Sequence, residues 1–175
     1  MKKIIIVISA IIGIVLLLLL NKKEEMKIIE IGDKVPNFIL KDQNGNSFNI
    51  ENEIGKRMVI YFYPKDDTPG CTKEACKFRD DFELFSDLNA LVIGISSDSV
   101  QSHKKFEEKY NLPFTLLADT NNAVRKLFGV PKSMFILPGR VTYIINKKGR
   151  VDYIFNNQFE AEKHIEIALK KLKEQ

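Results

Sequence analysis

The sequence predicts an α/β domain in which helices cover both faces of a mixed central sheet. Short apolar runs rich in β-branched and aromatic residues, typical of buried strands, alternate with longer segments of helical periodicity. Two further runs of this kind flank the turn signal Asn-Lys-Lys-Gly at residues 146–149, and an amphipathic helix follows them. Strands and helices in this order are expected to form one layered domain.

The domain is expected over residues 31–175 and opens with a hairpin at residues 31–50, whose polar turn lies at residues 42–46. The helix predicted at residues 72–88 has an apolar face that consists of Ala75, Phe78, Phe82 and Phe85. The remaining predictions are strands at residues 58–63, 90–96, 114–117, 141–145 and 151–155, and helices at residues 99–110, 122–128 and 161–172.

Residues 4–20 form an apolar run that we interpret as a single-pass transmembrane helix ahead of the domain. The run is seventeen residues long, which is at the short end for crossing a bilayer. We expect an uncleaved anchor rather than a signal peptide, because no small-x-small cleavage site follows. Membrane localisation is therefore expected, with residues 21–30 as a linker. Lysines on both sides of the run leave the orientation open, and Met26 could begin a shorter soluble product.

The composition argues against several other classes of protein. The 27 basic and 23 acidic residues give a net charge of +4 without a basic block, so no nucleic-acid partner is expected. The two cysteines are too few for a structural zinc site, which usually takes four Cys or His ligands. They are also too few for a small disulfide-stapled fold. Neither a metal nor a cofactor is expected.

The chain is organised around the strand at residues 58–63, the loop after it and the start of the next helix. The loop contains two prolines, two aspartates and a glycine, and Cys71 lies where the helix begins. Unpaired backbone N–H groups and the helix dipole favour a thiolate at that position, and the thiolate is the reactive form of cysteine. Only Asp66 and Asp67 in the loop oppose this effect, and neither has to point at the sulfur.

Cys71 and Cys76 lie five positions apart on one predicted helix. At a rise of ~1.5 Å and a turn of ~100° per residue, their Cα atoms would lie roughly 8 to 9 Å apart. A disulfide requires less than about 7 Å. The two sulfurs therefore cannot join until the first turns of the helix unwind, which favours a redox switch over a structural crosslink.

The run from Phe62 to Cys76, Phe-Tyr-Pro-Lys-Asp-Asp-Thr-Pro-Gly-Cys-Thr-Lys-Glu-Ala-Cys, resembles the active-site motif of the peroxiredoxins, Pro-x-x-x-Thr-x-x-Cys. It is most similar to the bacterioferritin-comigratory, or Q-type, subgroup, and the resemblance extends over residues 31–172. It implies a thioredoxin-like fold and a monomeric, antioxidant thiol peroxidase. The substrates would be hydrogen peroxide and organic hydroperoxides, and a thioredoxin-like dithiol would recycle the enzyme.

The resemblance also implies roles for individual residues. Cys71 would attack the peroxide and become a sulfenic acid, which Cys76 would resolve as an intramolecular disulfide. The Thr68 hydroxyl would hold the thiolate and a peroxide oxygen, and Pro64 would shape and shield the loop without chemistry of its own. Arg140 is one basic residue among many in the sequence, but the family motif places an arginine at this point, where its guanidinium would polarise the O–O bond.

Plainer interpretations of these residues stay open. Cys71 could be a small buried hydrophobic residue, Cys76 a core-facing helix residue and Thr68 an ordinary turn residue. Lys73 and Glu74 are interpreted as solvated charges in the first helical turn. The competing arginines, Arg79 and Arg125, fit exposed helix faces.

Two alternative functions remain at this stage. A membrane-tethered thiol–disulfide oxidoreductase would use the same fold, but its chemistry favours Cys-x-x-Cys, whereas this chain has four residues between its cysteines. A non-enzymatic redox sensor would relay the oxidation of Cys71 to a partner protein.

Overall fold

The computed structural model describes residues 28–133 and 137–174. Within that part of the chain, no helix has the length and apolar character needed to span a bilayer. This finding corrects the prediction of a transmembrane helix at residues 4–20, which lie outside the described residues.

Seven strands of the described residues form one mixed sheet in the order β2-β1-β5-β4-β3-β8-β9. Its strands are β1 (Ile39–Asp42), β2 (Ser47–Asn49), β3 (Arg57–Phe62), β4 (Ala90–Ser96), β5 (Thr115–Ala118), β8 (Val141–Ile145) and β9 (Val151–Asn156). The central strands β3, β4 and β5 are parallel, and every other pairing is antiparallel. The mixed central sheet predicted from the sequence is therefore confirmed.

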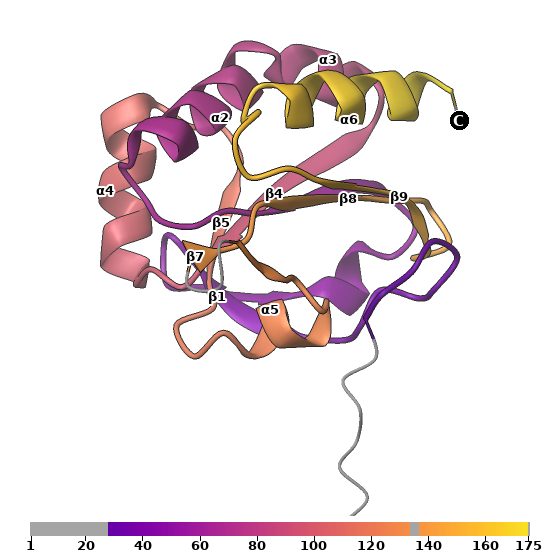
Figure 1. Ribbon diagram of the computed structural model, residues 1–175, viewed down its shortest axis with the longest axis horizontal. Helices are drawn as coiled ribbons and strands as arrows, with labels where there is room; N and C mark the ends of the chain where they lie inside the picture. The colour runs from indigo at the N-terminus through magenta and orange to yellow at the C-terminus, as the bar shows by residue number, and fades with distance from the viewer. Residues whose placement is uncertain (1–27, 134–136, 175) are drawn as a thin grey trace, which may run out of the picture.

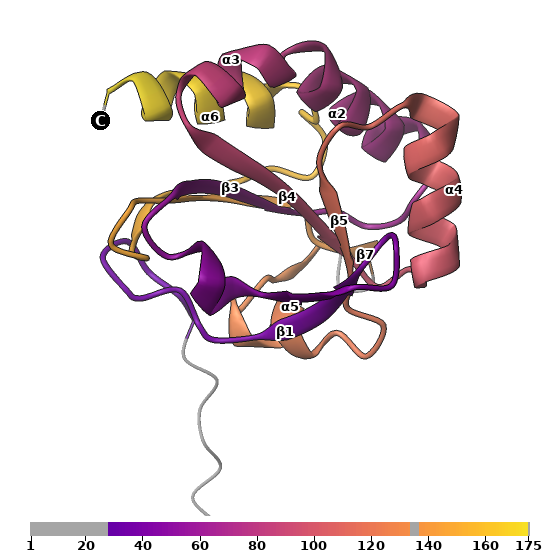
Figure 2. The same ribbon diagram turned by 180° about the vertical axis from the view of Figure 1, so that it is seen from behind.

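Helices lie on both faces of the sheet, also as predicted. One face is covered by α2 (Pro69–Asp80), α3 (Phe82–Asp87), α4 (Val100–Tyr110) and α6 (Lys163–Lys173), and the opposite face by α5 (Ala123–Leu127) and the 3-10 helix η1 (Ile50–Glu53). Figure 1 shows α2, α3 and α6 above the sheet and α5 below it, and Figure 2 shows the same layers from behind. A further short pair, β6 (Lys132–Ser133) and β7 (Leu137–Pro138), lies apart from the main sheet.

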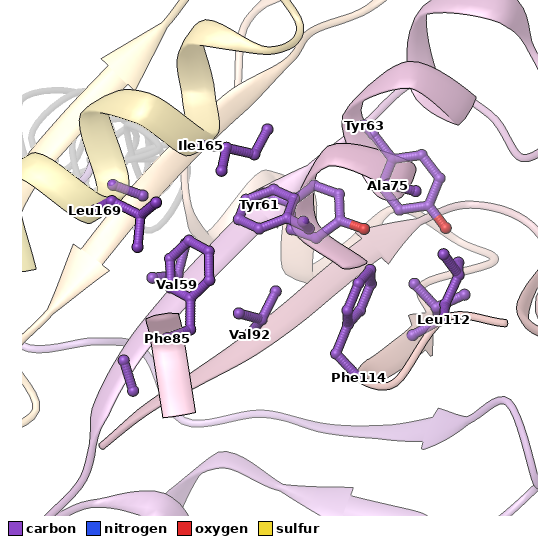
Figure 3. Close-up of a cluster of buried hydrophobic side chains, with 14 of the residues drawn as sticks. Val59, Tyr61, Tyr63, Ala75, Phe85, Val92, Leu112, Phe114, Ile165 and Leu169 are labelled. Atoms are coloured by element: carbon purple, nitrogen blue, oxygen red, sulfur yellow. The ribbon is translucent and has the colours of Figure 1, made fainter. Parts of the chain in front are cut away.

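Strand β3 is buried on both sides because its side chains alternate between two cores. Val59 and Tyr61 point into the core beneath α2, α3 and α6, and Met58 and Ile60 into the core against α5. Figure 3 shows the first core, with Tyr61 among residues from the strands and helices around it. The Tyr61 ring stacks on Phe78 of α2, with 4.6 Å between ring centroids.

Gly94 of β4 makes room for that ring. It pairs with Tyr61 in the parallel register, and a Cβ atom at this position would lie 2.7 Å from the Tyr61 ring. A glycine inside a strand often marks such a close approach. The packing of Tyr61 and Phe78 then places α2, and with it Cys71, against the end of β3.

One predicted helix is divided in the structure. The apolar pattern at residues 72–88 predicted a single helix, but α2 ends at Asp80 and α3 begins at Phe82. Asp81 has φ −97° and ψ 9°, outside helical geometry. The break lets Phe78 and Phe85 both reach the core without a proline or glycine to signal it.

Candidate active site

Cys71 is the third residue of α2, and Thr68 is the N-cap residue. Pro69 occupies the first helical turn, where its missing N–H group would have no partner in any case. The first helical hydrogen bond runs from Thr72 N to the Thr68 carbonyl, at 2.8 Å. Cys71 is 2% exposed, so the sulfur is largely shielded from solvent. The predicted position of Cys71 at the start of a helix is confirmed.

Arg140 reaches this sulfur from the neighbouring strand. Phe62 at the end of β3 pairs with Val141 at the start of β8, so Arg140 enters the sheet beside the loop that carries Cys71. Its Nη2 donates to Cys71 Sγ at 3.4 Å. The side chain is 4% exposed. The family resemblance singled out Arg140 among the basic residues, and the structure places its guanidinium beside Cys71.

Glu74 is the second partner of this guanidinium. The structure corrects its interpretation as a solvated charge, because the Glu74 side chain is fully buried and its carboxylate accepts a hydrogen bond from Arg140 Nη1. Burial raises the pKa of Glu74 to about 8, and Arg140 opposes that rise. Burial alone would lower the pKa of Arg140, but the charges of Glu74 and Cys71 outweigh it and the pKa is raised.

A buried histidine lies behind Glu74. His164 of α6 hydrogen-bonds the Asn157 carbonyl through Nε2 at 2.8 Å and the Thr142 hydroxyl through Nδ1 at 2.7 Å. Because a carbonyl only accepts, Nε2 carries the proton and Nδ1 accepts from Thr142. Burial lowers the pKa of His164 to about 4, which keeps the ring neutral. The next residue in that loop, Gln158, accepts from Arg140 Nε through its carbonyl at 3.3 Å.

The other predicted site residues lie at the edge of this cluster. Thr68 is half-buried, and its hydroxyl donates to the Lys65 carbonyl at 3.0 Å rather than to the sulfur. Pro64 directly follows the buried end of β3 and is half-buried. Cys76 is also half-buried and lines a surface cavity of about 500 Å³. Both cysteines are free, and the helix between them is continuous.

The two loop aspartates are turned away from Cys71. Asp66 is buried and accepts from Ser102 and His103 of α4, while Asp67 is exposed and accepts from Lys109 and Tyr110. Both carboxylates therefore bind side chains of α4, whereas the Cys71 sulfur accepts a hydrogen bond from the positively charged guanidinium of Arg140.

Arg125 was predicted on an exposed helix face, and the structure corrects this prediction. It is 7% exposed and donates to the Gly139 carbonyl at 2.8 Å and to the Tyr63 carbonyl at 2.7 Å. Those two carbonyls precede Arg140 and Pro64 in the chain. Arg125 therefore ties together the two chain segments that carry the site. Arg79 remains partly exposed, as predicted.

Glu74 and His164 both had a signal in the sequence that was not used. Glu74 lies three residues after Cys71 and four before Phe78, so it shares the apolar face of α2. His164 directly precedes the apolar face of α6 that begins at Ile165. Polar side chains on a buried face are expected to have polar partners. Within the described residues, no group of three or more Cys, His, Asp or Glu side chains could hold a metal ion.

Comparisons with known proteins agree with this arrangement. The model of the AhpC/TSA family matches residues 31–154. Peroxiredoxin Q, chloroplastic, from Triticum aestivum is 56% identical over 140 residues, which are 79% of this chain and 64% of the relative. The protein of the same name from Arabidopsis thaliana is 55% identical over 143 residues, 81% of this chain and 66% of the relative. The chain thus spans just under two thirds of the length of these relatives.

Solved structures give the same family. Peroxidoxin BcpB from Mycobacterium tuberculosis matches with a TM-score of 0.77 and 34% identity, covering 83% of this chain and 97% of its own. A mutant of PrxQ from Xylella fastidiosa matches with a TM-score of 0.79 and 30% identity, and the match covers 85% of this chain and 98% of the PrxQ chain. These matches confirm the predicted thioredoxin-like fold of the peroxiredoxin type.

The membrane localisation predicted from residues 4–20 is corrected as well. The plant relatives are named as chloroplastic proteins, and no helix of the described residues could span a membrane. The family assignment does not depend on that segment, because the matched residues begin at 31. With a cysteine and an arginine in contact at the start of α2, and relatives of this identity, the chain belongs to the peroxiredoxin (AhpC/TSA) family and to its Q-type subgroup.

Proposed function

We propose that this protein is a thiol peroxidase that reduces hydrogen peroxide and organic hydroperoxides. The observation that carries the proposal is the 3.4 Å contact between Arg140 Nη2 and Cys71 Sγ at the start of α2. A fixed positive charge and the unpaired N–H groups of a first helical turn both favour the thiolate over the thiol. The similarity to plant relatives named peroxiredoxin Q supports the same assignment.

In the first step, the Cys71 thiolate attacks the terminal oxygen of the peroxide. An S–O bond forms, the O–O bond breaks, and the leaving oxygen takes up a proton to become water or an alcohol. Cys71 is oxidised to a sulfenic acid. Arg140 donates hydrogen bonds to the oxygens on which charge develops, while Glu74 and the Gln158 carbonyl hold the guanidinium in place. The Thr68 hydroxyl is proposed to turn from the Lys65 carbonyl toward the bound peroxide.

In the second step, the Cys76 thiolate attacks the Cys71 sulfur, an S–S bond forms and the hydroxyl leaves as water. This step requires the first turns of α2 to unwind, because both cysteines lie on one continuous helix. A thioredoxin-like dithiol then reduces the disulfide. Cys76 is the more accessible sulfur and lines a surface cavity, so it is the proposed point of attack for the reductant.

Rapid mixing of the reduced protein with hydrogen peroxide tests both steps. We expect fast oxidation of Cys71 in the wild type, complete loss of this reaction in Cys71→Ser, and an accumulating sulfenic acid in Cys76→Ser. Turnover with thioredoxin should be lost in both variants. Slow peroxide reaction together with brisk reduction of insulin disulfides would contradict the proposal and favour a thiol–disulfide oxidoreductase.

A further inference from the structure

The loop between β3 and α2 is fastened to α4 by the buried carboxylate of Asp66. Asp66 is 6% exposed. Its Oδ1 accepts from the Tyr63 hydroxyl at 2.7 Å, and its Oδ2 accepts from the Ser102 hydroxyl at 2.7 Å and from His103 Nδ1 at 2.9 Å. We call Tyr63, Asp66, Ser102 and His103 the Asp66 clamp. Three hydrogen bonds satisfy a charge that would otherwise be unfavourable to bury.

His103 contacts two other members of the clamp through Nδ1, which lies 2.9 Å from Asp66 Oδ2 and 3.4 Å from the Tyr63 hydroxyl. The ring is fully buried, and because a carboxylate can only accept, Nδ1 carries the proton that is donated to Asp66. Its other nitrogen, Nε2, is buried without a hydrogen-bond partner among the described residues. A buried nitrogen left without a partner is unfavourable, so the bond to Asp66 is what accounts for a histidine in this position.

The backbone of the loop is fixed at the same place. Asp66 N donates to Asp98 Oδ2 at 2.9 Å, and that oxygen also accepts from the Ser96 hydroxyl at 2.6 Å. Within the clamp, Asp66 lies two residues before the N-cap Thr68 and five residues before Cys71. It therefore fixes the chain immediately ahead of the segment that must unwind before Cys71 and Cys76 can meet.

We propose that Asp66 is a positioning residue whose hydrogen bonds determine how often the first turns of α2 open. This inference rests on the proposed function. A closed clamp keeps Cys71 beside Arg140, where it reacts with peroxide. An open clamp releases the start of α2 and lets the Cys71 sulfenic acid reach Cys76. Weakening the clamp therefore slows the first step and accelerates the second.

The neighbouring aspartate provides a matched control. Asp67 accepts hydrogen bonds from Lys109 Nζ at 2.7 and 2.8 Å and from the Tyr110 hydroxyl at 2.6 Å, so it also joins the loop to α4. Its side chain is 49% exposed, and solvent-exposed ion pairs contribute little to stability. Asp67 has φ 55°, a conformation that asparagine adopts readily. Asp67→Asn should leave both steps within twofold of the wild type.

Single-turnover kinetics without a reductant test whether a weaker clamp slows the oxidation of Cys71 and accelerates formation of the disulfide. Asp66→Asn should lower the second-order rate constant of Cys71 oxidation about tenfold and raise the rate of disulfide formation about tenfold. Ser102→Ala removes one donor and should move both rates in the same directions about threefold, which keeps the test decisive if Asp66→Asn does not fold. Rates that stay within twofold of the wild type in Ser102→Ala, or that change together in one direction, would overturn the inference.

The kinetic effect of weakening the clamp must be distinguished from the effect of a general loss of stability. Val151→Ala deletes buried methyl groups in the core on the opposite face of the sheet. It should lower the midpoint of urea unfolding without accelerating disulfide formation. Equal acceleration in Val151→Ala and Ser102→Ala would overturn the inference, because the effect would then be global.

Hydrogen exchange in the reduced protein tests the clamp without any peroxide. Ser102→Ala and Asp66→Asn should increase the exchange rates of the amides of residues 72–76 several-fold and leave those of α6 unchanged. Unchanged exchange at residues 72–76 would refute the clamp even if the peroxidase reaction is observed. Conversely, a wild-type protein inert to peroxide would refute the proposed function, and the exchange result would still decide whether the clamp exists.

Discussion

Arg140 hydrogen-bonds three groups at once: Cys71 Sγ, the Glu74 carboxylate and the Gln158 carbonyl. A guanidinium can do this because its N–H groups form a rigid planar fork. A lysine has the same charge but presents its three donors from a single point. The shape of the side chain, as well as its charge, therefore matters at this position.

Replacing Arg140 with lysine tests this distinction. Arg140→Lys keeps a positive charge beside Cys71 but loses the simultaneous contacts with Glu74 and the peroxide oxygens. We expect kcat/KM for hydrogen peroxide to fall on the order of 100-fold, the usual effect of removing one preorganised donor from a reaction site. Steady-state assays with thioredoxin would measure it. The exposed Arg150→Lys is the control, and an activity of Arg140→Lys equal to that control would contradict the argument.

At the scale of elements, α5 acts on the site from the opposite face of the sheet. The helix is only five residues long. Its Arg125 nevertheless reaches the carbonyls after β3 and before β8, and its guanidinium lies 5.5 Å from the centroid of the Phe62 ring. A short helix with one long side chain thus joins the two strands that deliver Cys71 and Arg140.

Arg125→Met should show how much this junction stabilises the fold. Methionine fills similar space but leaves the Tyr63 and Gly139 carbonyls without these donors, and each buried unpaired group costs about 1–3 kcal/mol. We expect the free energy of unfolding, measured in urea, to fall by about 2–4 kcal/mol. Lys126→Met, at the exposed neighbouring position, should change it by less than about 0.5 kcal/mol. A fall of under about 1 kcal/mol in Arg125→Met would show that the junction is dispensable.

The elements that were predicted correctly are those whose ends or apolar patterns are marked by residues next to them in the sequence. Strand β4 coincides with the predicted residues 90–96, and α4 begins after Ser99, whose side chain caps the helix. Helix α5 ends just before Gly129, which has φ 63°. The break at Asp81 between α2 and α3 was not predicted, because no proline or glycine marks it and the apolar pattern continues across it.

Across the whole fold, contacts between residues far apart in the chain were the hardest features to predict from the sequence. The position of Cys71 followed from the local strand–loop–helix pattern. The partners of Glu74 and Arg125 did not follow from any local pattern, because they lie 66 and 62 positions away in the chain, respectively. The contact of Arg140 with Cys71 was predicted only through the family motif. The domain boundary at residue 31 and the roles of Thr68 and Cys76 stay predictions.

Two buried titratable groups of the site, Glu74 and His164, should also determine how the stability of the protein depends on pH. Glu74 has its pKa raised from 4.5 to about 8, so between these values the folded protein holds a proton that the unfolded chain has released. Stability therefore falls as pH rises through that window. His164 has its pKa lowered from 6.5 to about 4, so stability rises with pH between about 4 and 6.5.

Because the two trends are opposite, the net dependence of stability on pH differs between two pH ranges. Between pH 4.5 and 6.5 the two contributions offset each other, each being about 1.4 kcal/mol per pH unit. From pH 6.5 to 8 the contribution of Glu74 is no longer opposed by that of His164, and we expect the free energy of unfolding to fall by about 2 kcal/mol. Urea unfolding at several pH values, in a Cys71→Ser background that lacks the reactive sulfur, would measure it. Glu74→Gln should abolish the decline, since an amide has no proton to lose in this range; a decline that persists in Glu74→Gln would assign it to another group.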